Sequence, residues 1–174
     1  MSQGAEQIRL AIGVFDSLSS LWRTVLALMD DGLLPEQFCL LATAAKAAEV
    51  GRPAGIGDDI SESDRYRVST LYERVETWPG SGNSHRIVAT AGPLVDSLLI
   101  AQRAGGALKN VGVSAEHMSE MLKQVQHGGL VLVINSLSPA QQRLSTRALL
   151  AQSPHSVKTY DFAVPTDQAQ RREV

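Results

Sequence analysis

Two stretches of this chain share one pattern, in which an apolar strand runs into a short polar turn and then into a helix. They cover residues 14–20 and 133–139. Each stretch continues through its helix to a second short strand, so each predicts a β-α-β unit. Two such units predict a domain of two layers, in which helices pack on one sheet.

The first unit is predicted by alternation followed by a helical repeat. Apolar residues alternate along 8–14, which is the period of a strand, and a second strand is expected at 38–42. Between them a helix should run from about residue 19 to 31, capped by Ser19 or Ser20 and ended by Gly32. Its inward face should consist of Leu21, Val25, Leu28 and Met29.

The second unit begins with a strand at 130–134 that is apolar on both faces, which favours a central, doubly covered position. Pro139 suits the first turn of the following helix, predicted to end near residue 152. The last strand is expected at 157–163. The inward residues of the helix should be Leu144, Ala148 and Leu149.

Residues 45–128 form an insertion between the two units. Ser61 and Asp64 resemble a capping box, and a short strand is expected at 86–90. Helices are expected after Ser61, over 94–105 and after Ser114. The first helix should bury Val68, Leu71, Tyr72 and Val75, and the last Ala115, Met118, Leu122 and Val125.

Together these elements predict an α+β fold of the ferredoxin-like kind, with a four-stranded antiparallel sheet, helices on one face and a helical insertion between the two halves. We expect a single domain over 1–174, with units at 8–44 and 129–164, the insertion at 45–128 and a flexible tail at 165–174. Leaving the side chains of Val131 and Val133 exposed to water would lose roughly 3 to 6 kcal/mol of stabilisation from hydrophobic burial. The insertion should therefore cover the second face first, and a homodimer what remains.

Composition narrows the setting and the partners. The net charge is −2 and the sequence contains no stripe of basic residues, so nucleic-acid binding is not predicted. The single cysteine, Cys39, excludes an internal disulfide and favours a reducing, cytoplasmic location. The sequence has no window of eighteen uncharged apolar residues, so no membrane span is predicted. Residues 1–7 lack the pattern of a signal peptide.

Two segments resemble a bacterial family of general stress proteins, the heat-induced YflT-like domains of unknown function. One runs from Gly13 through Asp16 and on through a helix to Asp31-Gly32-Leu33, and the other is 111–117 followed by 125–133. The resemblance covers about 90 residues and concerns motifs that form the fold. It implies a stress-related, non-enzymatic protein and transfers no functional residues. The chain departs from the family at Asp96, Arg103 and Lys109, which argues against a membrane role.

The histidines and acidic residues offer two hypotheses of site chemistry. His117, Glu116 and Glu120 could form half of a metal site on a helix, but a solvated face is favoured because further ligands are missing. His127 precedes two glycines at a helix end, where helix capping is favoured over a general-base role. His85 and His155 lie in predicted turns and are expected at the surface.

Other candidates favour structural roles. Cys39 is predicted to be buried and inert, Trp22 to be in or beside the core, and 80–82 to be a turn and not a phosphate loop. Asp58, Asp59 and Asp64 lack the spacing of a calcium loop. The candidate ligand or interface residues are Tyr72, Trp78, Val131 and Val133. No catalytic, cofactor-binding or metal-binding residues are predicted, and no cofactor.

Three functions remain open at this point. The first is a non-enzymatic cytoplasmic protein that acts by self-association, as a homodimer, or by binding another protein. The second is a sensor that binds a small-molecule ligand between the sheet and the inserted helices, as sheets of this class do. The third is a cofactor-independent enzyme of ferredoxin-like fold.

Overall fold

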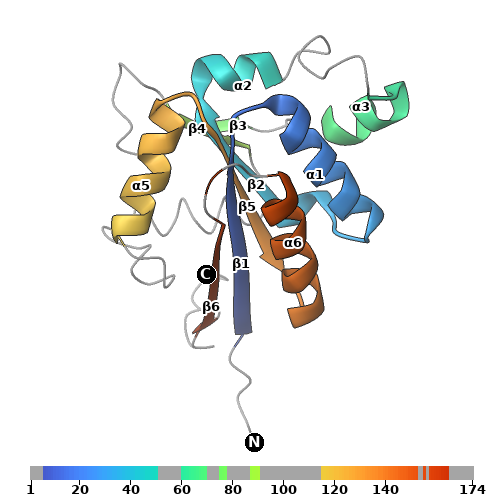
Figure 1. The fold of residues 1–174 in the computed structure, drawn as a ribbon, viewed down its shortest axis with the longest axis vertical. Coiled ribbons are helices and arrows are strands. Elements are labelled where there is room, and N and C mark those ends of the chain that lie inside the picture. The colour runs from blue at the N-terminus through green and yellow to red at the C-terminus, as the bar shows by residue number, and fades with distance from the viewer. Residues whose placement is uncertain are drawn as a thin grey trace, which may run out of the picture.

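The computed structural model describes residues 6–50, 60–69, 75–77, 87–90, 115–152, 155 and 157–164. The elements of the first unit are β1 (Glu6–Phe15), α1 (Leu18–Asp30), the 3₁₀ turn η1 (Pro35–Gln37) and β2 (Phe38–Thr43). The insertion contributes α2 (Ala44–Val50), α3 (Glu62–Ser69), β3 (Val75–Thr77), β4 (Ile87–Thr90) and α5 (Ala115–Gln126). The second unit consists of β5 (Leu130–Ser136), α6 (Pro139–Gln152) and β6 (Lys158–Val164) (Figure 1).

The strands form one antiparallel sheet of six strands in the order β3-β4-β2-β5-β1-β6. The α+β class and the antiparallel sheet predicted from the sequence are confirmed. Strand β5 lies between β1 and β2, with Val131 opposite Val14 on one side and opposite Leu41 on the other. The insertion adds two strands beyond β2: β4 near its predicted place, and β3, which was not predicted.

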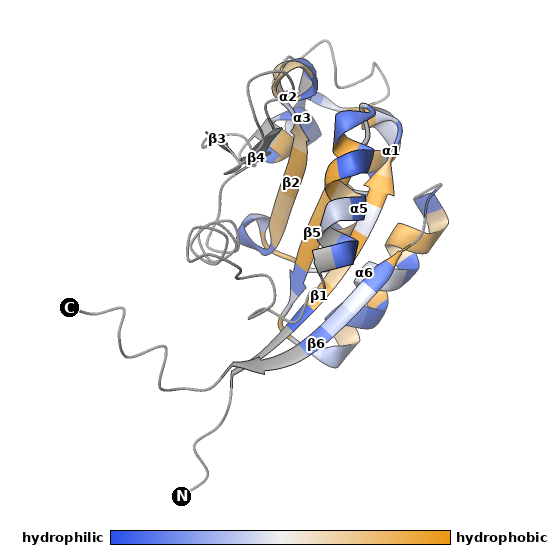
Figure 2. Ribbon diagram, turned by 90° about the vertical axis from the view of Figure 1, so that its left-hand side faces the viewer, coloured by the Kyte–Doolittle hydropathy of each residue, from blue (hydrophilic) through white to orange (hydrophobic). Residues whose placement is uncertain are grey.

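Helices α1 and α6 pack together on one face of the sheet, against β1 and β5 (Figure 1). The core between these layers contains Trp22 and Leu149 from the helices and inward residues of all three central strands. Figure 2 shows these strands as the most hydrophobic part of the molecule. The buried residues of the strands on this face are Ala11, Phe15, Phe38, Leu40, Ala42, Leu130, Leu132 and Ile134.

Helix α5 lies on the opposite side of the sheet from α1 and α6, and it packs against β2 and β5 (Figure 1). Among the side chains of α5 that the structure describes, the buried ones are Met121 and Val125, one helical turn apart. The sequence had placed Leu122 on this face, but Leu122 is only half-buried. The prediction that the insertion helps to cover the second face of the sheet is confirmed for α5.

Both helix ends next to glycine follow the expected chemistry. Gly32 and Gly128 have φ angles of 94° and 87°, which a residue with a side chain adopts only with strain. The predicted N-cap of α1, Ser19 or Ser20, was wrong by two or three residues. Ser17 is the N-cap, because its backbone is still extended and its hydroxyl accepts a bond from the Ser20 amide at 3.2 Å.

The helix predicted after Ser61 begins as expected but ends early. The Asp64 amide donates to the Ser61 hydroxyl at 3.1 Å, and Val68 is fully buried. The prediction that Val75 lies on this helix was wrong, since α3 ends at Ser69 and Val75 begins β3. Leu71, Tyr72, Ser114 and the helix expected over 94–105 lie outside the described residues.

Gly13 in the middle of β1 provides a test of the packing between sheet and helix. A Cβ atom at Gly13 would lie 2.7 Å from Leu149 Cδ2, so Gly13→Val should overpack the core and lower the free energy of unfolding by about 1–3 kcal/mol. An unobstructed strand glycine would instead gain stability from the same change. Urea denaturation followed by circular dichroism measures the effect.

The matched control is Leu149→Ala, alone and combined with Gly13→Val. Leu149→Ala alone should lower the free energy of unfolding by about 2–5 kcal/mol. In the Gly13→Val background the same change should lower it by less, because the valine fills part of the space that Leu149 leaves. Strictly additive free energies, or a more stable Gly13→Val protein, would contradict the proposed contact.

Candidate functional site

The candidate interface residues of β5 are buried inside the single chain. Val131 and Val133 are 0% and 3% exposed, and they lie on the face of the sheet that α5 packs against. A partner could reach these side chains only by displacing what covers them. Tyr72 and Trp78, the other two candidates, lie outside the described residues, as does the pocket that the sensor hypothesis would build from them.

The described histidines each hold a contact between neighbouring parts of the chain. The Tyr160 hydroxyl lies 2.6 Å from His117 Nδ1, with the two rings edge to face, and joins α5 to β6. His127 Nδ1 donates to the Lys123 carbonyl at 2.7 Å, so the predicted capping of α5 is confirmed. His85 lies outside the described residues.

His155 is exposed, as expected, but it has a partner that the sequence did not indicate. Its Nε2 lies 2.9 Å from Asp16 Oδ1, at the turn that follows β1. The contact joins the turn before β6 to the turn before α1, across most of the length of the chain. It holds two surface turns together.

The metal hypothesis gains no further ligand from the described part of the chain. Glu116 and Glu120 are exposed, and Glu120 accepts a bond from the Gln124 amide at 3.3 Å. Among the described residues, no group of three or more His, Cys, Asp or Glu could hold a metal ion. Asp58, Asp59 and the turn at 80–82 lie outside that part.

Cys39 and Trp22 occupy the structural positions predicted for them. Cys39 is a free, fully buried thiol in β2, and burial raises its pKa from 9.0 to about 12. A thiol in that state is a poor nucleophile at neutral pH. Trp22 is 1% exposed and belongs to the core beneath α1.

A buried polar network ties the start of β2 to the start of α6. The Gln37 amide nitrogen donates to the Asn135 carbonyl at 2.7 Å and to Gln141 Oε1 at 3.1 Å. Its oxygen accepts the Leu34 amide at 2.9 Å, and Gln141 Oε1 also accepts the Leu137 amide at 2.9 Å. Every polar group of Gln37 is thus used in holding loops, which makes the network structural.

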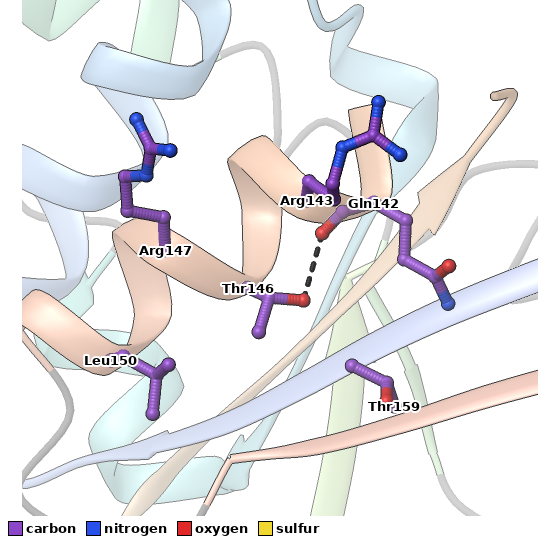
Figure 3. Close-up of a pocket in the computed structure, with 6 residues that line it drawn as sticks. All are labelled: Gln142, Arg143, Thr146, Arg147, Leu150 and Thr159. Carbon is purple, nitrogen blue, oxygen red and sulfur yellow. Dashed lines mark hydrogen bonds between the residues drawn. The ribbon is translucent and has the colours of Figure 1, made fainter. Parts of the chain in front are cut away.

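An open groove between α6 and the edge strand β6 is the described surface with the most promising chemistry for binding. Its volume is about 480 Å³, and five of its six lining residues come from α6. In Figure 3 two arginines extend to one side of α6, while the other helix residues point toward the strand. The lining residues are Gln142, Arg143, Thr146, Arg147, Leu150 and Thr159.

The groove combines positive charge with apolar surface. Arg143 and Arg147 are exposed and lie one helical turn apart, and neither forms an ion pair within the part of the chain that the structure describes. Like charges at this spacing cost a helix about 0.2–0.5 kcal/mol. Leu150 is 65% exposed. The groove can therefore accept an anionic group beside an apolar one.

Two polar contacts fix the shape of the groove. The Thr146 hydroxyl donates to the Gln142 carbonyl at 2.8 Å, which leaves its methyl group as part of the lining (Figure 3). The Gln142 amide nitrogen donates to Asp161 Oδ1 at 2.7 Å and links α6 to β6 at one end. Asp161 forms no ion pair with either arginine in the described part of the chain.

Sequence reasoning missed this groove, although one signal was present. Arg143 and Arg147 are spaced to lie on one side of a helix, and no acidic residue occurs anywhere in 139–152 to pair with them. That cationic helix face was visible before the structure. Its position beside an edge strand was not, because it depends on the sheet order.

Comparison of the chain with protein-family models, with curated proteins and with solved structures found no match. In the described part of the chain, none of the helices has the length and apolar character needed to cross a membrane.

The burial of Cys39 predicts a loss of stability at alkaline pH. The unfolded thiol ionises above pH 9, whereas the folded thiol keeps its proton to about pH 12. The unfolded state is therefore favoured as pH rises through this window, by about 1.4 kcal/mol at pH 10. Urea denaturation at pH 8 and pH 10 measures the change.

The control is Cys39→Ala, which should be less stable at pH 8 but should lose less stability between pH 8 and pH 10. Burial also raises the pKa of Tyr160 above its usual value of 10.0, so the comparison stops at pH 10, before tyrosine dominates. Equal losses in the two proteins would contradict the assignment.

Proposed function

We propose that this protein is a non-enzymatic binding module, and that the groove between α6 and β6 takes an acidic segment of a protein partner. The observation that carries the proposal is the pair Arg143 and Arg147, two exposed guanidinium groups one turn apart with no carboxylate partner among the described residues. Arginine forks bind carboxylates in a geometry that lysine does not offer.

The form of the groove favours a polypeptide over a small molecule. Sites for small molecules are concave and bury most of the ligand, whereas this groove is open along the edge of the sheet. Leu150, exposed beside the arginines, offers an apolar anchor of the kind found at protein interfaces. The partner segment should therefore carry acidic and apolar side chains together.

The contacts of the histidines also support binding over catalysis. His117, His127 and His155 each link two elements or cap a helix. The thiol of Cys39 is buried and protonated at neutral pH. The described histidines and the single thiol are thus engaged in structural contacts or buried.

The finer assignment of fold, family and location follows from the same residues. We propose a ferredoxin-like core made of β1, β2, β5 and β6, supported by the sheet order β2-β5-β1-β6 and by the β-α-β units. We also propose membership of the YflT-like stress-protein family, supported by the segments at 13–33 and 125–133. A cytoplasmic location is supported by the single, buried thiol.

The test uses a capped, fluorescent eight-residue peptide in which Glu and Val alternate at odd positions and Thr fills the even positions. Reversing both charges, in Arg143→Glu combined with Arg147→Glu, should weaken binding by about tenfold or more, since attraction becomes repulsion at two sites. Fluorescence anisotropy at low salt measures the dissociation constant.

The control is Lys123→Glu, which changes the net charge in the same direction at an exposed residue of α5, away from the groove. It should leave binding nearly unchanged. Equal weakening by the control, or no weakening by the double reversal, would remove the groove from the proposed function.

A further inference from the structure

We propose that the acidic partner segment binds as an additional strand paired with β6, extending the sheet beneath the groove. This inference rests on the proposed function and specifies its mode of binding. It concerns the backbone of β6, whereas the proposed function concerns the side chains of α6. The two can therefore be tested separately.

The position of β6 makes strand addition possible. It is the last strand in the sheet order, and among the described strands it pairs with β1 alone. An edge strand presents a row of backbone donors and acceptors that a further strand can use. The seven residues of β6 match the length of an ordinary strand.

The register of β6 aligns this edge with the groove. Thr159 lies opposite Ala11, and Ala11 belongs to the core under α6, so Thr159 and Asp161 face the α6 side of the sheet. Lys158 and Tyr160 face the α5 side, where Tyr160 meets His117. A strand added beside β6 would project alternate side chains toward α6, where the exposed Leu150 and the arginines lie.

Charge argues that the occupant is an acidic partner and not a second copy of this chain. Antiparallel pairing of two β6 strands about a two-fold axis would place both α6 helices on the same face of the joined sheet. Arg143 and Arg147 of each copy would then belong to the same face of the joined sheet, which would carry four positive charges and gain no opposite charge from the partner. The strand β6 adds one carboxylate to this face, Asp161, against the two arginines of α6.

The experiment compares two N-methylated forms of the eight-residue peptide. In an added strand, alternate residues direct their amides toward the neighbouring strand. Methylation at odd positions and at even positions should therefore differ: one form should bind at least about tenfold more weakly than the unmodified peptide, and the other within about threefold. Hydrogen exchange should also show new protection of β6 amides in the presence of the unmodified peptide.

The outcomes separate this inference from the proposed function. If both methylated forms bind equally, or if the amides of β6 gain no protection, strand addition is overturned. In that case binding that still depends on Arg143 and Arg147 leaves the proposed function standing. A dimer in light scattering whose β6 amides are protected without peptide would also overturn the inference, since a second copy would then occupy the edge.

Discussion

Strand β5 must be kept from water on both faces, and the rest of the fold is arranged around that requirement. Its first five residues are buried, and hydrogen-bonded neighbours lie on both sides. Burying one valine or leucine is worth about 1.5–3 kcal/mol, so five consecutive apolar residues exert a strong constraint. Helices α1 and α6 cover one face, and α5 packs against the other.

Two glycines show how closely these layers approach. At Gly13 a Cβ atom would collide with Leu149 of α6, and at Gly129 it would lie 2.8 Å from the Gln124 carbonyl oxygen of α5. One glycine therefore admits the helix on the first face, and the other admits the turn that brings α5 back into β5. The helices could not approach as closely if larger residues stood at these two positions.

Most helices and strands of the two units could be predicted from the sequence. The signals that predict them, the spacing of apolar residues and the glycines at helix ends, involve only residues close together in the chain. The N-cap at Ser17 was missed because three serines and a leucine follow Asp16 within four positions, and any of the serines could supply the hydroxyl. Val75 was assigned to a helix because its spacing from Val68 fits one. The strand that it joins is stabilised by pairing with β4, which local spacing does not reveal.

Other contacts of the described structure join residues far apart in the chain. Asp16 meets His155, and His117 meets Tyr160, only after the sheet order has been fixed. The sequence indicated an arginine pair on a helix, but the groove needs β6 to be an edge strand beside that helix, and the sequence does not determine strand order.

Burial of the central strand also determines where the described part of this protein can bind another molecule. The hydrophobic residues that first indicated an interface, Val131 and Val133, are already used within the chain. A sheet whose central strands are covered on both faces can still offer its edges, where backbone groups and flanking side chains stay accessible. At β6 the flanking side chains are those of Arg143, Arg147 and Leu150. The binding that we propose at this edge would therefore depend on charge and backbone pairing more than on the apolar surface of the sheet.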